Sequence, residues 1–232
     1  MIVEHQALAL NWLTADDLNN PTTLVLGSFN PFNPKGQAGL NYYYGRTTNQ
    51  FWKSVARIIG EPENYFFDQQ HGLNRKSEVM TTRFCCLDVI DSIDFECENE
   101  EILTDYLNIK IFAEFADQTI WTTSTNRQGE TITLKRNYNN TILELLRVSQ
   151  SIIKVIHTMG TRIGSFKNIR PVELNGDPIG FRQYVQEIIS ICERRGIEFI
   201  FYSLSPSQYA VNTGATQIAE LDNWLRDSLN LE

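Results

Sequence analysis

The chain has 232 residues and a mass of 26.7 kDa, with 42% hydrophobic and 11% aromatic residues, 20 basic and 28 acidic side chains. This length can bury one substantial core, and we expect a single domain over residues 1–232. The formal net charge of −8 excludes a polybasic protein that binds polyanions through bulk charge alone, although a local basic rim remains compatible with it.

The first residues lack the basic start and continuous apolar core of a signal peptide, and no apolar run approaches the ~20 residues needed to span a bilayer. A cytoplasmic protein without membrane contact is therefore expected. The four cysteines form no C-x-x-C pair and the three histidines form no H-x-x-x-H pair. Because zinc and iron–sulfur sites need such spacings, we expect neither a metal nor a cofactor.

In chain order, short β-rich runs alternate with amphipathic segments, which is the pattern of an α/β domain. Strands are predicted at residues 23–27, 152–159 and 197–202. Helices are predicted at residues 10–18, 51–59, 141–148, 181–195 and 215–229. The region 88–140 has no clear pattern and is assigned mixed structure. We expect a three-layer α/β/α fold with a short, mainly parallel central sheet of about four strands.

Ligands of open α/β sheets bind beyond the carboxyl ends of the strands. The loops that follow Leu26, Met159 and Tyr202 are therefore expected to converge on one edge of the sheet. The segment that begins at Gly160 lacks the P-loop lysine and the three-glycine Rossmann spacing, so we interpret it as a turn. The chain also lacks the G-x-S-x-G motif of many serine hydrolases.

Two of these loops carry a distinctive pattern. The first contains Gly27, Asn30-Pro31 and a run of tyrosines, and it ends at Asn49-Gln-Phe-Trp52, where a helix is predicted to begin. The second contains Ser205-Pro-Ser207. Taken separately, each has an ordinary explanation, because Asn-Pro makes turns, aromatic residues fill cores and Ser-Pro-Ser is a common loop.

In this order, the two loops resemble the motifs of the uracil-DNA glycosylase superfamily. The first motif of this superfamily is a strand that ends in glycine and is followed by Asn-Pro or Asp-Pro. A later helix opens with Asn-x-Phe-Trp. The last motif is His-Pro-Ser or Asn-Pro-Ser. The residues at 27–29 and 43–52 are most similar to the hypoxanthine-DNA glycosylase branch, and Asn30-Pro31 also resembles the mismatch-specific uracil glycosylases. One extra residue separates Gly27 from Asn30, and Ser205 stands where the family has His or Asn.

The resemblance implies a base-excision repair enzyme that hydrolyses the N-glycosidic bond of a deaminated base, uracil or hypoxanthine. The polar loop residues expected to be catalytic are Asn30, Asn49 and Ser205. Either asparagine would position the attacking water. The residues expected to bind the base or its phosphate are Gly27, Ser28, Phe29, Tyr44 and Ser207. The residues expected to contact DNA are Arg46, Arg162, Lys167, Gln208 and Tyr209.

The expected partner is DNA that contains a damaged or mismatched base, bound by a monomer. The alternative is a non-catalytic homologue on the same fold that binds nucleic acid or a free nucleobase. For the basic residues, the alternative to a DNA contact is an ordinary solvated surface. His157, inside a predicted strand, is interpreted as a core histidine, and Cys85-Cys86 as structural.

Overall fold

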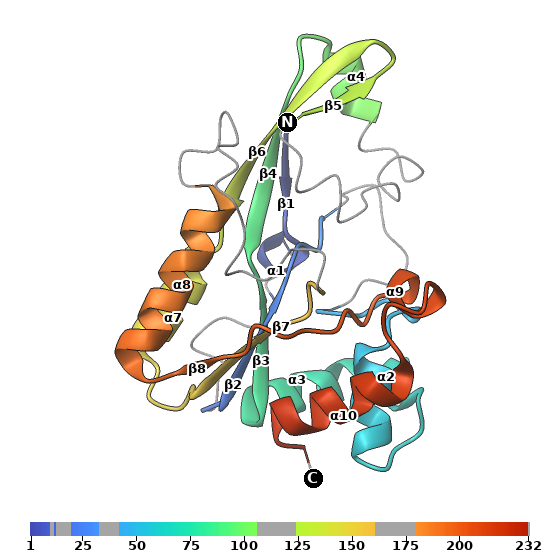
Figure 1. Ribbon diagram of the computed structural model, residues 1–232. Helices are drawn as coiled ribbons and strands as arrows, with labels where there is room; N and C mark the ends of the chain where they lie inside the picture. The colour runs from blue at the N-terminus through green and yellow to red at the C-terminus, as the bar shows by residue number, and fades with distance from the viewer. Residues whose placement is uncertain (10–11, 13–19, 33–41, 106–123, 161–179, 232) are drawn as a thin grey trace.

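The computed structural model of the chain is an α/β fold built on a four-stranded parallel sheet that is flanked by helices (Figure 1). The structure describes residues 1–9, 12, 20–32, 42–105, 124–160 and 180–231. The parallel strands, in their order across the sheet, are β3 (Phe84–Asp88), β2 (Thr23–Gly27), β7 (Lys154–His157) and β8 (Glu198–Phe199). The predicted fold class is confirmed.

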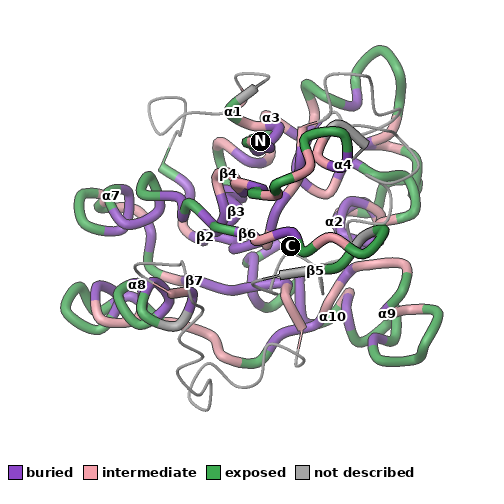
Figure 2. The backbone as a smooth tube through the Cα atoms, turned by 90° about the horizontal axis from the view of Figure 1, so that it is seen from above, coloured by how far each residue is buried: buried purple, intermediate pink, exposed green. Residues whose placement is uncertain are grey.

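Two groups of helices lie on opposite sides of this sheet, as both views show (Figures 1 and 2). One side carries α7 (Asn140–Val148) and α8 (Phe181–Arg195). The other carries α2 (Phe51–Ile58) and α10 (Ile218–Leu229), with α3 (Gly72–Thr82) beside the edge strand β3. Every residue of β2 and β3 is buried, because helices cover the sheet on both faces.

Helix α8 illustrates how local sequence determines an element. Its buried apolar residues include Tyr184, Val185 and Ile188, which share one face at helical spacing. The helix ends at Gly196, whose φ of +67° is the left-handed conformation that glycine adopts without steric cost. The predicted bounds of this helix, residues 181–195, are confirmed.

A second, antiparallel sheet was not predicted. Its strands, in spatial order, are β1 (Ile2–Glu4), β4 (Ile90–Glu96), β6 (Glu130–Tyr138) and β5 (Ser124–Arg127). Only Val89 separates β3 from β4, so the chain passes directly from the parallel sheet into the antiparallel one. The region 88–140, assigned mixed structure from its sequence, therefore supplies three of the four strands of this sheet.

The remaining described elements are short and lie around the two sheets. They are α1 (Gln6–Ala9), the 3-10 helix η2 (Tyr65–Phe67), α4 (Glu100–Asp105) and α9 (Gln208–Asn212). The strands predicted at 152–159 and 197–202 are shorter than expected, and the final helix begins at Ile218 rather than at residue 215. The helix predicted at 10–18 falls, apart from residue 12, outside the described residues. None of the helices in the described part of the chain is long and apolar enough to cross a membrane.

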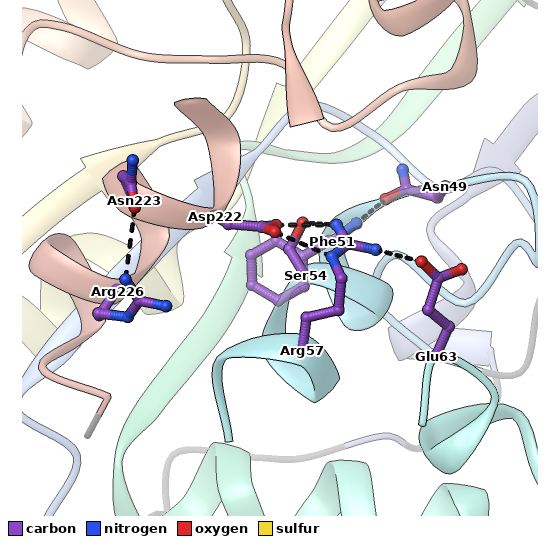
Figure 3. A network of polar contacts seen from close by, with 8 residues as sticks. All are labelled: Asn49, Phe51, Ser54, Arg57, Glu63, Asp222, Asn223 and Arg226. Atoms are coloured by element: carbon purple, nitrogen blue, oxygen red, sulfur yellow. Dashed lines mark hydrogen bonds and ion pairs between the residues drawn. The ribbon is translucent and has the colours of Figure 1, made fainter. Parts of the chain in front are cut away.

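Helices α2 and α10 are joined by a charged contact (Figure 3). The guanidinium of Arg57 donates from Nε to Oδ2 of Asp222 at 2.9 Å, and from Nη2 to Oδ1 of the same carboxylate at 2.8 Å. The exposed fractions of these two side chains are 23% and 18%, and the hydrogen bond with Asp222 raises the pKa of Arg57. The contact ties the helix after the first loop to the helix after the second.

Arg57→Ala should lower the free energy of unfolding by about 2 kcal/mol, because Asp222 loses its bidentate partner. A double-mutant cycle with Asp222→Ala should give a coupling energy of about 1 kcal/mol in urea denaturation. Arg226→Ala is the matched control: this exposed residue donates to Asn223 on the same helix, and its loss should change stability by less than about 0.5 kcal/mol. A coupling energy near zero would show that the ion pair does not hold the helices together.

Candidate functional site

The parallel sheet has a topological switch point between β2 and β7. Strand β2 connects to β3 on one side, and the chain then crosses over to β7 on the other side. Ligands of open α/β sheets bind at the carboxyl ends of the strands beside such a point. Gly27 ends β2 there, and His157, which pairs with Leu26, ends β7.

The loops that follow these strands meet at this edge. The hydroxyl of Tyr44, from the first loop, lies 2.8 Å from the hydroxyl of Thr158, which follows β7. The backbone N–H of Gln50 donates to the carbonyl of Pro206 at 2.8 Å, which joins the start of α2 to the Ser-Pro-Ser loop. The predicted convergence is confirmed for the loops after Leu26 and Tyr202, whereas the loop after Met159 lies, apart from Gly160, outside the described residues.

Gly27 lies directly against a buried carboxylate. A Cβ atom at this position would come within 2.0 Å of Oδ1 of Asp88 and 2.8 Å of Oη of Tyr44. Gly27 and Asp88 are paired residues of the adjacent strands β2 and β3, so the two backbones hold this contact in place. Only glycine leaves room here for both side chains.

Asp88 is the centre of a buried polar cluster that sequence reasoning missed. Its Oδ2 lies 2.8 Å from Nε2 of His5, and the side chains of both residues are 3% exposed. The same oxygen accepts a hydrogen bond from Nδ2 of Asn30 at 2.9 Å. The available signal was a carboxylate close to Cys85-Cys86 in sequence, but only those two cysteines were interpreted, and as structural residues.

The loop that carries Asn30 is fastened to the N-terminal segment. The N–H of Gln6 donates to the carbonyl of Asn30 at 2.7 Å, and the N–H of Phe32 donates to the carbonyl of Glu4 at 2.7 Å. Between these two bonds, Pro31 forms an antiparallel bridge with His5. The position of Asn30 is therefore set by backbone bonds as well as by its bond to Asp88.

Asn49 has a different role at the start of α2. Its Oδ1 accepts the backbone N–H of Phe51 at 2.9 Å, as Figure 3 shows, which satisfies one of the free N–H groups at the helix start. Because a backbone N–H can only donate, the acceptor must be the carbonyl oxygen of the side chain. The Nδ2 group of Asn49 is left as the donor of this side chain.

Tyr44 is held in an unusual conformation beside the switch point. Its φ of +54° lies in the left-handed region, which is uncommon for a bulky residue and marks local strain. Its ring stacks on Phe51 with centroids 4.3 Å apart. Burial, followed by the nearby Cys86 and Asp88, raises the pKa of the Tyr44 hydroxyl, which therefore stays protonated.

The two residues between Gly27 and Asn30 face the protein rather than open solvent. Phe29 is 7% exposed, and its ring centroid lies 5.8 Å from that of His5. Ser28 is half-buried, and its carbonyl accepts the N–H of Ile90. Phe29 thus packs against the His5–Asp88 pair, and its placement favours support of the cluster over direct stacking on a ligand.

The Ser-Pro-Ser loop is organised by its own hydroxyl groups. Ser207 is the N-cap of α9, and its Oγ accepts the N–H of Ala210 at 3.2 Å. The Oγ of Ser205 donates to the Oγ of Ser207 at 3.1 Å. The Oγ of Ser207 is therefore the acceptor in both bonds, and its own hydroxyl proton is left to donate to another group. Gln208, half-buried, and Tyr209, 59% exposed, open the helix that follows.

The predicted basic rim is only partly described. Arg46 is exposed in the loop before α2. Arg162 and Lys167 lie outside the described residues. A contribution of these residues to DNA binding stays a prediction.

The buried histidine and cysteines near the site suit structural roles. His157 is 2% exposed, and burial lowers its pKa to about 4, although the carbonyl of Phe201, 3.1 Å from Nε2, opposes this shift. This is the core histidine expected from the sequence. Cys85 and Cys86 are buried in β3, and burial raises the pKa of both thiols.

Asp91, in β4, gives this region a pH dependence. Burial is the main cause that raises the pKa of its carboxyl to about 6 from 3.8, and the nearby Asp88 adds to the shift. Between about pH 4 and pH 6 the folded protein keeps a proton that the unfolded chain has lost. The contribution of this group to the free energy of unfolding therefore falls as the pH rises through that window.

Asp91→Asn should raise the free energy of unfolding by about 1–2 kcal/mol at pH 8, where the wild-type protein must hold a half-buried charge. At pH 4 the two proteins should have nearly equal stability. Urea denaturation at both pH values measures the effect, with Glu96→Gln on the exposed end of the same strand as the control. An equal gain at both pH values would contradict the assigned titration.

Among the residues that the structure describes, no group of three His, Cys, Asp or Glu side chains is placed to hold a metal ion. Comparison of the chain with protein-family models, with curated proteins and with solved structures gives no match. The chemistry of the site is therefore inferred from its residues: an oriented carboxamide, a buried carboxylate, a stacked tyrosine and a serine hydroxyl gathered at the end of a parallel sheet.

Proposed function

We propose that the protein is a monofunctional DNA glycosylase, similar to the uracil-DNA glycosylase superfamily, that removes a deaminated base. The observation that carries this proposal is the meeting of the two motif-bearing loops at the switch point, joined by the Gln50–Pro206 backbone bond. Polar and aromatic residues that are far apart in the sequence thereby come to one edge, and base excision requires both kinds of residue beside an extruded base.

Asn30 is the residue that we assign to water positioning. The Nδ2 of Asn30 donates to Oδ2 of Asp88, so the Oδ1 of the same carboxamide faces away from that carboxyl group. An outward oxygen can accept a proton of water and align the water with C1′ of the sugar. The Oδ1 of Asn49, in contrast, is occupied by the N–H of Phe51.

In the proposed reaction, the C1′–N bond breaks and the oxygen of water bonds to C1′, which leaves a free base and an abasic sugar. The bonding electrons of the C1′–N bond leave with the base as an anion; the water loses one proton to solvent, and the base anion takes up one proton from solvent, so that the products are a free base and a sugar hydroxyl. The Nδ2 of Asn49 and the hydroxyl of Ser207 are the donors that could stabilise charge on the departing base. Tyr44 has one ring face on Phe51, and we assign its opposite face to stacking on the extruded base.

The identity of the base is proposed from Ser205. This residue stands where the resembled family has His or Asn, and its hydroxyl proton is directed to Ser207. A hydroxyl stabilises a leaving anion less well than a charged or well-aligned donor. We therefore expect slow excision of uracil paired with adenine, and faster excision of hypoxanthine or of a base in mismatched or single-stranded DNA, where extrusion costs less.

The proposal is tested by single-turnover incubation with oligonucleotides that carry uracil or hypoxanthine, each in paired, mismatched and single-stranded form. Alkaline cleavage then reports abasic sites. Cleavage at the lesion of at least one substrate, with the undamaged strand intact, is the expected result. Binding without abasic sites on any substrate would instead favour the non-catalytic homologue.

A further inference from the structure

The His5–Asp88–Asn30 cluster extends the site beyond the residues that the loop motifs assign. His5 comes from the N-terminal segment and Asp88 from the end of β3, so the three side chains belong to separate parts of the chain. Asp88 is 3% exposed, although a buried carboxylate is costly unless its neighbours compensate for the loss of water. The hydrogen bonds that Asp88 receives from its neighbours indicate the role of its carboxylate.

The tautomer of His5 follows from its two contacts. The backbone N–H of Ala7 donates to Nδ1 at 2.9 Å, so Nδ1 carries a lone pair and the ring proton is on Nε2. Nε2 lies 2.8 Å from Oδ2 of Asp88 and donates to it. The rings of Trp12, Phe29 and Tyr43 surround the imidazole with centroids 6.0, 5.8 and 5.8 Å away.

Both the backbone and the side chain of Asp88 are held by neighbouring residues. Its backbone carbonyl accepts Nδ2 of Asn139 at 3.1 Å, and its Oδ1 lies against the Cα of Gly27, where no Cβ could fit. Its Oδ2 receives the two donors, Nε2 of His5 and Nδ2 of Asn30. A rotation of the carboxylate would therefore break both bonds or meet the backbone of β2.

We infer that Asp88 and His5 are positioning residues that act through Asn30. A flipped carboxamide would set its oxygen against the Oδ2 of Asp88, where two acceptors repel, so the cluster selects the one orientation that turns the Oδ1 of Asn30 away from Asp88. This inference rests on the proposed function, because it gives that oxygen the task of holding the attacking water. Support from neighbouring side chains is what keeps such a group in productive geometry.

Asp88→Ala should lower the single-turnover excision rate by about tenfold or more, with little change in the dissociation constant for DNA. Asp88→Asn is the conservative variant, since its carbonyl oxygen can take the place of Oδ2 and accept both bonds; it should keep most of the rate. His5→Gln, which retains a side-chain N–H donor, should also be close to wild type, whereas His5→Ala should resemble Asp88→Ala.

The decisive comparison is Asp88→Ala in an Asn30→Ala background. If Asp88 acts through Asn30, removing it should then have almost no further effect on the rate, whereas a role in general stability would lower the rate by the same factor in both backgrounds. If Asp88→Ala does not fold, His5→Ala provides the same comparison. Equal factors in the two backgrounds, with an active wild-type protein, would overturn the positioning role alone.

Hydrogen exchange tests the orientation of the Asn30 side chain independently of catalysis. In ¹⁵N-labelled protein, the side-chain amide protons of Asn30 should exchange slowly with solvent in the wild type and quickly in Asp88→Ala, because the donor bond to Oδ2 is lost. Rapid exchange in the wild type would overturn the inferred orientation, whether or not the protein is active. A wild-type protein that excises no base would overturn the proposed function, and with it the role of the cluster in catalysis.

Discussion

Asn30→Ala should lower the rate of base excision by about a hundredfold or more, as the loss of a positioned polar group commonly does. The substitution removes the carboxamide that we assign to the attacking water and leaves the loop backbone bonded to Gln6. Affinity for DNA that carries the lesion should change much less. The measurement is single-turnover excision at saturating protein, together with fluorescence anisotropy for binding.

Two substitutions at Asn49 serve as the comparison for Asn30. Asn49→Asp keeps an oxygen that can accept the N–H of Phe51 and cap α2, but it loses the Nδ2 donor. Asn49→Ala loses both, so a rate loss shared by the two variants would assign catalysis to the donor. Full activity in Asn30→Ala would show that this residue does not position the water.

Gly27→Ala should destabilise the protein by about 3 kcal/mol and abolish most of its activity, because the site has no room for a methyl group. The added Cβ would lie 2.0 Å from Oδ1 of Asp88, a carboxylate that cannot move without breaking its bonds to His5 and Asn30. Thermal and urea denaturation measure the loss of stability.

The cause of this destabilisation can be tested by relieving the contact. In an Asp88→Ala background the nearest obstructing atom is gone, and Gly27→Ala should then cost much less than it does alone. The hydroxyl of Tyr44, 2.8 Å from the same Cβ position, remains in this background, so a smaller part of the cost should persist. Additive effects of the two substitutions would show that the carboxylate is not what excludes a side chain at Gly27.

The parallel sheet and its helices were predictable because their signals are local. The apolar run of β2 ends at a glycine, and α8 combines helical spacing of apolar residues with a glycine stop at Gly196. The meeting of the loops could also be expected, because the carboxyl ends of parallel strands share one edge of the sheet. The predicted bounds of β2 and α8 are confirmed, whereas β7 and β8 are shorter than predicted, and neither β3 nor α3 was predicted.

The antiparallel sheet was missed although its sequence carries recognisable signals. In β6 the buried residues Ile132, Leu134 and Tyr138 fall on alternate positions, and Gln128-Gly129 forms a two-residue turn with φ values of +53° and +88°. An alternating pattern beside such a turn indicates a hairpin. The pairing of β6 with β4 joins segments that are distant in sequence, and this long-range pairing could not be read from local composition.

The candidate site was predictable only where it follows loop motifs. Asn30, Tyr44 and Asn49 stand in the resembled motif, whereas His5 and Asp88 are 83 positions apart and have no shared local pattern. Their contact exists because β1 and β4 place the N-terminal segment beside the end of β3. Such a cluster depends on tertiary packing, which a single sequence does not display.

Release of free base is the defining product of a glycosylase and can be measured directly. Excess protein is incubated with an oligonucleotide that carries uracil or hypoxanthine in a mismatch, and the free base is quantified by mass spectrometry beside the abasic sites revealed by alkali. A monofunctional glycosylase should yield free base and abasic sites in equal amounts, and Asn30→Ala should yield far less of both. No free base from either substrate, under conditions in which the protein binds the DNA, would contradict the proposed activity.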